Sequence, residues 1–289
     1  MKTRSSLIAI FMLVATTLAG GKGVEAETTL EKARSQGYVT MGFTNEIPYS
    51  FSEEGKLTGA DTEVARVILA KMGITEVVGV LTEFQSLIPG LLAKRFDVNS
   101  TMYIRPSRCE QILFTDPVWA VGDAVIVKAG NPKNIHSYKD VAANPEIKIG
   151  VLTGGTGNID HMKNDGITDG QIVYFATPES ALAGVKTGRI DGFGSTAIGN
   201  QALLDKAKDS TLERAVPFTQ PEKDGKPLLG FGGLGFRMED KDFYEEFNKH
   251  LNAFVGTPEH LALVRPFGFT EEEIRPAMGV KSLEQLCKP

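Results

Sequence analysis

The sequence predicts an α/β protein built as two lobes, and three observations carry this prediction. Helical segments alternate along the chain with short strand-like segments, which is typical of α/β folds. A chain of 289 residues suits two domains, because a domain usually holds roughly 100–200 residues. The pattern at 91–97, a helix end followed by a basic, an apolar and an aspartate residue, recurs at 185–191. We therefore expect two halves of similar construction.

The first 26 residues have the layout of a secretory signal peptide. Lys2 and Arg4 precede an apolar run over 7–18, and small residues lead up to a cleavage site near Ala26. The alternative is a membrane anchor, but the run is shorter than the ~20 apolar residues that a span requires. We therefore expect the mature protein to be exported.

The first lobe is expected to open with a helix, a strand and a second helix. The pattern predicts a helix over 29–34 and a strand over 38–43. The segment 45–49 contains a proline and should form a loop at the carboxyl end of that strand. Asp61 is expected to cap the second helix, and Gly73 to end it.

A strand over 77–81, a helix over 86–94 and a strand over 97–101 should follow. Two extended segments, 121–127 and the glycine-rich 228–236, are expected to cross between the lobes, because glycines can absorb the backbone rotation of a hinge. Ordinary inner strands are the alternative for both. The predicted boundaries are 27–127 plus 230–289 for lobe one and 128–229 for lobe two.

Composition and charge exclude several classes of protein. Hydrophobic residues make up 42% and charged residues 23% of the chain, which indicates a globular protein and not a disordered one. The formal net charge of −5 argues against nucleic-acid partners. The four histidines lack the spacing of a metal site, and neither a nucleotide-binding lysine loop nor a catalytic serine elbow is present. We expect no metal, no cofactor and no catalytic residue.

Two further features concern the second lobe and the chain end. Residues 153–157 form a glycine-rich loop, where backbone N–H groups could hold a carboxylate at a helix start; a plain strand-to-helix turn is the alternative. Cys109 and Cys287 are an even number of cysteines in an exported chain, which favours a disulfide over two separate thiols.

Two segments resemble the family 3 extracellular solute-binding proteins. These are Gly59-Ala60-Asp61-Thr62-Glu63-Val64-Ala65 and the stretch 102–118, which includes Phe114-Thr115-Asp116-Pro117-Val118. The resemblance implies a type II periplasmic-binding-protein fold, two lobes joined by two crossing strands, with a ligand between them. It also implies a periplasmic, monomeric, non-enzymatic protein that delivers a small solute to the membrane permease of an ABC transporter.

Within that family, four motifs look most like those of ectoine/hydroxyectoine-binding proteins: 45–49, 83–90, 105–109 and the terminal Leu286-Cys287. The resemblance implies ligand contacts by Glu46, Tyr49, Phe84, Tyr103 and Arg108, with Thr156 and Asp191 as candidates from lobe two. Tyrosine stands at 49 and 103, and phenylalanine at 84, where the resemblance leads us to expect the opposite. These exchanges keep the aromatic faces and move the hydroxyl groups.

The chemistry of these residues suits a zwitterion such as ectoine, a cyclic amidinium with a carboxylate. Arginine meets a carboxylate with two parallel N–H groups, which lysine cannot do. A carboxylate such as Glu46 can pair with the amidinium, and aromatic faces can enclose the delocalised cation. Arg108, Glu46 and three aromatic residues supply these functions at predicted strand ends and loops, where open α/β sheets bind ligands.

Three alternatives remain, and one of them is a ligand-sensing subunit that reports to a membrane receptor instead of serving transport. In many amino-acid binders of this family, an aspartate at the position that Thr196 occupies here pairs with the α-ammonium of the ligand. The threonine therefore argues against an amino-acid ligand without excluding it. Some proteins of this fold resemble cyclohexadienyl dehydratases, and Glu46 could serve in such an enzyme. No second acid is clearly placed with it in the sequence.

Overall fold

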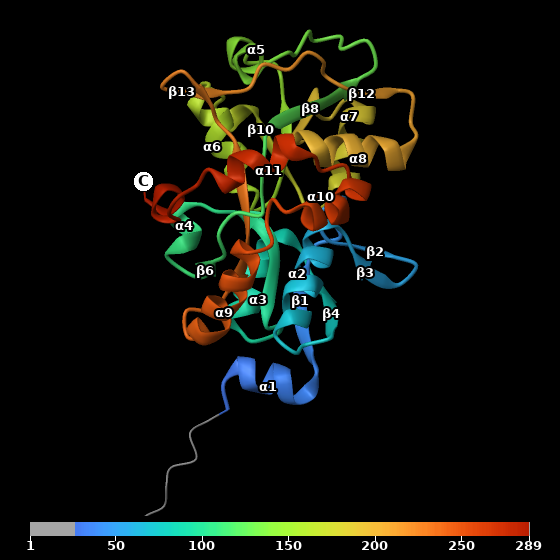
Figure 1. Ribbon diagram of the computed structural model, residues 1–289. Helices are drawn as coiled ribbons and strands as arrows, with labels where there is room; N and C mark the ends of the chain where they lie inside the picture. The colour runs from blue at the N-terminus through green and yellow to red at the C-terminus, as the bar shows by residue number, and fades with distance from the viewer. Residues whose placement is uncertain (1–26, 289) are drawn as a thin grey trace, which may run out of the picture.

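The computed structural model describes residues 27–288, except for the side chains of residues 156 and 157. The expected signal peptide, residues 1–26, lies outside the described residues. The described chain forms two lobes stacked one above the other, each with helices around a central sheet (Figure 1). No described helix combines the length and the apolar character that crossing a membrane requires.

Lobe one contains a six-stranded sheet with the order β4-β1-β5-β15-β6, in which β7 also pairs with β15. Its strands are β1 (Tyr38–Phe43), β4 (Glu76–Leu81), β5 (Val98–Tyr103), β6 (Leu113–Phe114), β7 (Trp119–Val121) and β15 (Gly230–Phe236). The small hairpin of β2 (Phe51–Glu53) and β3 (Lys56–Thr58) lies beside it. The first strand has the predicted bounds. The strand predicted over 77–81 begins one residue earlier and ends as predicted, and the strand predicted over 97–101 begins one residue later and ends two residues later.

Lobe two contains a five-stranded sheet with the order β10-β9-β11-β8-β12. Its strands are β8 (Asp123–Lys128), β9 (Ile149–Leu152), β10 (Ile172–Phe175), β11 (Gly192–Thr196) and β12 (Leu212–Arg214). In both sheets three parallel strands are followed by an antiparallel one, β15 in lobe one and β8 in lobe two. The expectation of two similar halves is therefore confirmed. The hairpin of β13 (Glu222–Lys223) and β14 (Lys226–Pro227) precedes the return to lobe one.

Helices pack around each sheet. Those of lobe one are α1 (Thr29–Gln36), α2 (Ala60–Lys71), α3 (Leu87–Leu92), α4 (Pro106–Cys109), α9 (Lys241–Asn252), α10 (Pro258–Val264), α11 (Glu271–Met278) and α12 (Glu284–Cys287). Those of lobe two are α5 (Tyr138–Ala143), α6 (Thr156–Asn164), α7 (Pro178–Thr187) and α8 (Ala197–Ala207). Short 3₁₀ turns occupy Phe84–Ser86, Asp169–Gln171 and Arg265–Phe267.

The first crossing between the lobes differs from its predicted position. The sequence assigned residues up to 127 to lobe one, whereas β8 belongs to the second sheet. Val125 and Val127 pack into one core of lobe two, and Ile126 packs into the other, because side chains alternate across a strand. We therefore draw the boundary at Gly122.

The glycines of β15 allow close packing. A Cβ at Gly232 would lie 2.2 Å from Cζ2 of Trp119, so any larger residue would displace that ring. None of the β15 glycines has a positive φ. The interpretation as an inner strand is therefore confirmed for this segment.

The aspartates of the repeated sequence pattern, Asp97 and Asp191, form hydrogen bonds at the outer ends of the two sheets. The backbone N–H of Thr40 donates to Asp97 Oδ2 at 2.9 Å, and that of Lys148 donates to Asp191 Oδ2 at 2.8 Å. Each aspartate returns a backbone hydrogen bond to the same neighbour. Both residues thus tie the start of their strand to the adjacent strand.

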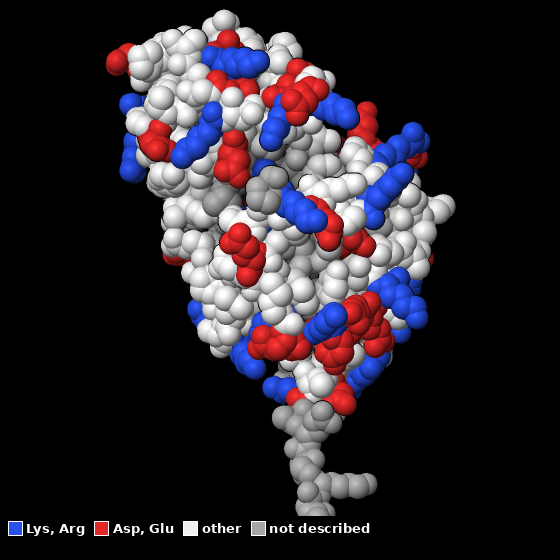
Figure 2. Space-filling model, turned by 90° about the vertical axis from the view of Figure 1, so that its left-hand side faces the viewer, with Lys and Arg blue, Asp and Glu red and all other residues white. Residues whose placement is uncertain are grey.

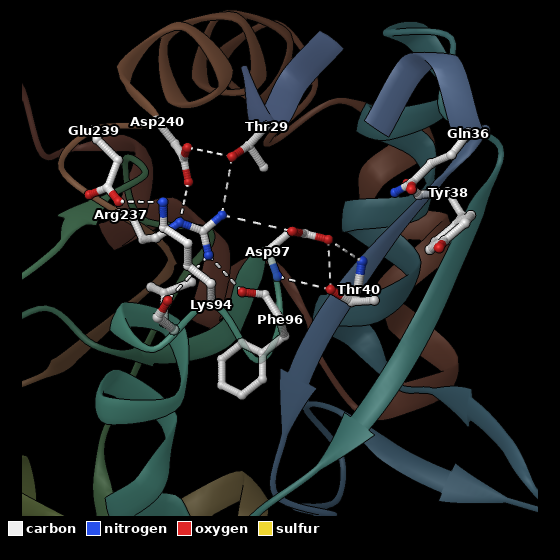
Figure 3. A network of polar contacts seen from close by, with 11 residues as sticks. Thr29, Gln36, Tyr38, Thr40, Lys94, Phe96, Asp97, Arg237, Glu239 and Asp240 are labelled. Carbon is white, nitrogen blue, oxygen red and sulfur yellow. Dashed lines mark hydrogen bonds and ion pairs between the residues drawn. The ribbon is translucent and has the colours of Figure 1, made fainter. Parts of the chain in front are cut away.

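A buried arginine extends this arrangement in lobe one (Figure 3). Arg237 is 2% exposed and donates to the carbonyl oxygens of Phe96 and Leu91 at 2.7 and 3.2 Å. Its guanidinium also pairs with Asp240 at 2.6 Å and lies 3.8 Å from Asp97. This network joins the end of β15 to the start of β5, at the end of lobe one opposite the cavity described below.

Cys109 and Cys287 form a disulfide with their Cα atoms 5.7 Å apart. It fastens α12 at the end of the chain to α4 of lobe one, where Leu283 and Leu286 also pack against the core. The favoured pairing of the two cysteines is present in the structure.

Candidate functional site

A cavity lies between the lobes, with about 540 Å³ of space not filled by protein atoms, part of which is open to solvent. Lobe one contributes the ends of β1 and β5 and the segments that follow them, and lobe two contributes the ends of β9 and β11. The lining residues are Glu46, Tyr49, Phe84, Thr101, Met102, Tyr103, Arg108, Trp119, Val151, Leu152, Gly155, Asn158, Gly194, Ser195 and Thr196. The carboxyl ends of the parallel strands of both sheets therefore meet at this cavity, as the rule for open α/β sheets leads us to expect.

Arg108 lies on the short helix α4, directly after β5, and is 5% exposed. Its two terminal nitrogens donate to the carbonyl oxygens of Tyr103 and Gly154, both at 2.8 Å. Since Gly154 belongs to lobe two, this guanidinium bridges the lobes. Burial, and then the nearby Arg105, lower its pKa to about 10, so it remains charged at neutral pH.

Glu46 lies in the turn after β1, held by a backbone bridge to Ser50. Its side chain is half-buried on the cavity wall. Burial raises the pKa of this carboxyl to about 7, against the opposing effect of Arg108. No hydrogen bond to its carboxylate occurs within the described residues. A carboxylate held in this way is poised to accept a cation.

Aromatic residues make up half of the lining that lobe one contributes. The Phe84 ring lies 5.4 Å from the guanidinium carbon of Arg108. Trp119, which the sequence analysis missed, lies between two predicted contacts: its ring centroid is 4.9 Å from that of Tyr49 and 6.0 Å from that of Tyr103. Its position directly after the Phe114–Val118 motif was the only available signal. Tyr49, Trp119 and Tyr103 therefore form a continuous aromatic surface.

Asp61 has a different role from the predicted helix cap. Helix α2 begins at Ala60, and Asp61 lies inside its first turn, 1% exposed. Its Oδ1 accepts from Trp119 Nε1 at 2.8 Å, so it orients the tryptophan from behind. Burial raises the pKa of Asp61 to about 8, which keeps this carboxyl largely protonated at neutral pH.

Lobe two faces the aromatic surface with small and polar groups. Thr196 caps α8 by accepting from Gly199 N–H at 3.1 Å, and it also accepts from the Tyr49 hydroxyl at 2.7 Å. Its hydroxyl is therefore occupied, and it supplies no charge for an ammonium group. The glycine-rich loop reaches the cavity at Gly155, where α6 begins.

A second set of contacts closes the lobes beside the cavity. Arg105 of lobe one lies 2.9 Å from His161 Nε2, and His161 Nδ1 lies 2.9 Å from Asp123 Oδ2. Asn158 donates to the other oxygen of Asp123 at 2.6 Å. His161 and Asp123 are almost fully buried, so this chain of contacts belongs to the closed arrangement of the lobes.

The structure brings together five of the seven predicted ligand contacts: Glu46, Tyr49, Phe84, Tyr103 and Arg108. Thr156 is the first residue of α6, and its side chain lies outside the described residues. Asp191 is not at the cavity. It directly precedes β11 (Gly192–Thr196), so it lies five residues, or roughly 16 Å, from Thr196 at the cavity end of that strand. Its carboxylate is instead bonded to Lys148 N–H at the outer edge of the sheet.

The fold and this cavity define a protein that encloses a small solute between two lobes. The model of the bacterial extracellular solute-binding proteins, family 3, matches residues 39–268. The chain belongs to this family, whose members bind substrates and are not enzymes.

Relatives and solved structures agree with this assignment. The chain is 35% identical over 284 residues to the probable amino-acid ABC transporter periplasmic-binding protein y4tE of Sinorhizobium fredii, covering 96% of this chain and 90% of that protein. It is 30% identical over 208 residues to the ABC transporter arginine-binding protein 1 of Escherichia coli, covering 71% and 79%. The crystal structure of EhuB in complex with hydroxyectoine matches with a TM-score of 0.79 at 30% identity, covering 90% of this chain and 98% of that chain. The fold is that of the type II periplasmic binding proteins.

Proposed function

We propose that this protein is the exported, monomeric binding component of an ABC importer, which captures a compact zwitterion of the ectoine class in the periplasm and delivers it to a membrane permease. One observation carries the proposal. A single cavity holds a buried guanidinium, a carboxylate without a hydrogen-bond partner among the described residues, and a wall of aromatic rings.

Each group matches one part of such a solute. Two N–H groups of Arg108 are bonded to Tyr103 and Gly154, and the remaining ones can meet a carboxylate. Glu46 can pair with the cationic ring, and the aromatic faces stabilise its delocalised charge by about 0.5–2 kcal/mol each. Because the cavity is lined by both lobes, a bound solute favours the closed arrangement.

An α-amino acid is the second candidate, and the names of several relatives favour it. Its ammonium group would have to pair with Glu46, because Thr196 is neutral and already accepts two hydrogen bonds. An amino-acid binder should therefore respond little when Phe84 is changed to leucine. A delocalised cation loses its π partner in the same variant.

Titration calorimetry with ectoine and a panel of α-amino acids tests the proposal. We expect heat with ectoine, and a loss of about 1–2 kcal/mol for Phe84→Leu. Clear binding of an α-amino acid without heat from ectoine would end the ectoine interpretation and leave the binding-protein assignment unchanged. Sequencing the amino terminus of protein recovered from the periplasm tests export and cleavage near Ala26.

A further inference from the structure

One contact between the lobes lies beside the cavity and is not part of its lining. Arg105 of lobe one and His161 of lobe two are joined at 2.9 Å through Nη2 and Nε2. His161 is 2% exposed, and neither residue belongs to the described lining of the cavity. The contact therefore depends on closure of the lobes and not on the chemistry of an enclosed solute.

The chemistry of the two side chains determines the direction of this hydrogen bond. A guanidinium group has donors only, so Nε2 of His161 accepts and carries no proton. The proton of the neutral imidazole then lies on Nδ1, which donates to Asp123 Oδ2 at 2.9 Å. His161 thus uses one ring nitrogen within lobe two and the other across the lobes.

Asp123 holds the imidazole from a fixed position at the crossings. It is fully buried and directly follows Gly122, where the chain enters lobe two. Its backbone N–H donates to Gln220 Oε1 at 2.7 Å, and its carbonyl oxygen accepts from Gln220 Nε2 at 2.8 Å. Gln220 lies on the segment that leads back to lobe one, so its amide joins the two crossings. The orientation of the imidazole is therefore set without a contribution from Arg105.

A contact that is present only between closed lobes shifts the closing equilibrium. The closed arrangement gains the bond from Arg105 to His161, and the open arrangement lacks it. The apparent affinity for a solute falls with the fraction of protein that is able to adopt the binding arrangement. The bond therefore strengthens the binding of every solute by one common factor. For a hydrogen bond with a charged donor, this factor is on the order of tenfold.

We infer that Arg105 and His161 form a latch that sets how tightly and how long the protein holds a solute, without taking part in the choice of solute. Both are positioning residues, because they act through the arrangement of the lobes. Solutes enter while the lobes are open, so loss of the latch speeds dissociation and leaves the association rate unchanged. The inference rests on the two-lobed binding protein and not on the identity of its ligand.

Two substitutions of His161 separate its two hydrogen bonds. His161→Asn retains a donor near the place of Nδ1 and is too short to reach Arg105. His161→Gln is long enough to place an acceptor near the position of Nε2. Calorimetry and stopped-flow fluorescence, with ectoine and L-arginine as probes, should show about tenfold weaker binding and about tenfold faster dissociation for His161→Asn. His161→Gln should retain most of the affinity, and each probe that binds should lose the same factor.

The matched control is Lys163→Gln on the same helix, because the ion pair of Lys163 with Asp169 lies within lobe two. It should leave affinity and dissociation rate unchanged. Arg105→Ala supplies a double-mutant cycle: in that background, the additional change His161→Asn should have little further effect. Arg105→Ala also carries the test by itself if circular dichroism shows that His161→Asn is not folded.

Distances between labels on the two lobes test the latch with and without solute. Both native cysteines are in the disulfide, so the exposed residues Lys56 of lobe one and Lys206 of lobe two, each changed to cysteine, accept labels selectively. His161→Asn should shift the distance distribution towards the open arrangement.

Distributions identical to those of the unmutated protein, in the absence of solute and with every probe, would overturn the latch. A loss that differs between probes, or one that persists unchanged in the Arg105→Ala background, would overturn it as well. If ectoine gives no heat with the unmutated protein, the proposed ligand is wrong, and the distance measurements still decide on the latch.

Discussion

The pKa of Glu46 predicts a specific pH dependence of solute binding. Burial raises this pKa to about 7 in the closed arrangement of the lobes, so Glu46 is protonated in an increasing fraction of molecules as the pH falls below 7. A cationic ring pairs with the ionised carboxylate only. Binding therefore has to remove the proton first, and the affinity is fully present above the pKa and is lost as the pH falls through it.

The magnitude follows from this one pKa. Relative to high pH, the apparent affinity should be about twofold weaker at pH 7, about tenfold weaker at pH 6 and about a hundredfold weaker at pH 5, if the bound carboxylate stays ionised throughout. At pH 6 each bound solute should release about 0.9 proton. Titration calorimetry in buffers of different ionisation enthalpy measures the affinity and this proton release together, with a solute that does not titrate in the range.

Glu46→Gln is the control, since it keeps the shape and one acceptor but cannot ionise. Its affinity should be lower at pH 8 and nearly independent of pH down to 6. A flat profile for the unmutated protein would refute the pairing of Glu46 with a cation.

Four further predictions follow from the structure. Arg108→Ala should weaken solute binding by about 2–5 kcal/mol in calorimetry, because it leaves the solute carboxylate buried and unpaired, and Arg108→Lys should be intermediate. Asp191→Ala should destabilise the fold by about 1–3 kcal/mol in urea, because Lys148 N–H loses its acceptor, with solute affinity unchanged within twofold. Replacing Cys109 and Cys287 by serine should lower the stability by up to about 5 kcal/mol, because the disulfide closes a loop of sequence separation 178. Small-angle scattering should show a smaller radius of gyration with saturating solute, and identical profiles would contradict closure around the ligand.

Charges of both signs are mixed on the surface. Acidic and basic side chains are interspersed over both lobes on the face seen in Figure 2, without a broad region of one sign. This mixture accompanies a formal net charge of −5 for the full sequence.

Local patterns were sufficient for much of the fold. The alternation over Tyr38–Phe43 predicted β1 at its observed bounds, because a half-buried strand repeats every two residues whatever its neighbours are. The prediction of Asp61 as a helix cap was wrong. A short polar residue before an apolar helix suggests a cap, but the local sequence does not show that this carboxyl accepts a hydrogen bond from Trp119, 58 positions away. The partner, and not the local propensity, set the role of this carboxyl.

The sequence by itself determined the kinds of groups at the site: one arginine, one glutamate and several aromatic residues at the ends of predicted strands. The sequence also contained the repeated pattern that indicates two similar halves, since in each half an aspartate ties the start of one strand to the adjacent strand. Only the tertiary structure decided which of these groups face one another. Asp191 and Thr196 lie at opposite ends of one strand, so their neighbours depend on which end of the sheet meets the other lobe. The same is true of the Tyr49 hydroxyl, because its hydrogen-bond partner, 147 residues away, is fixed by packing between the lobes and leaves no trace in the local sequence.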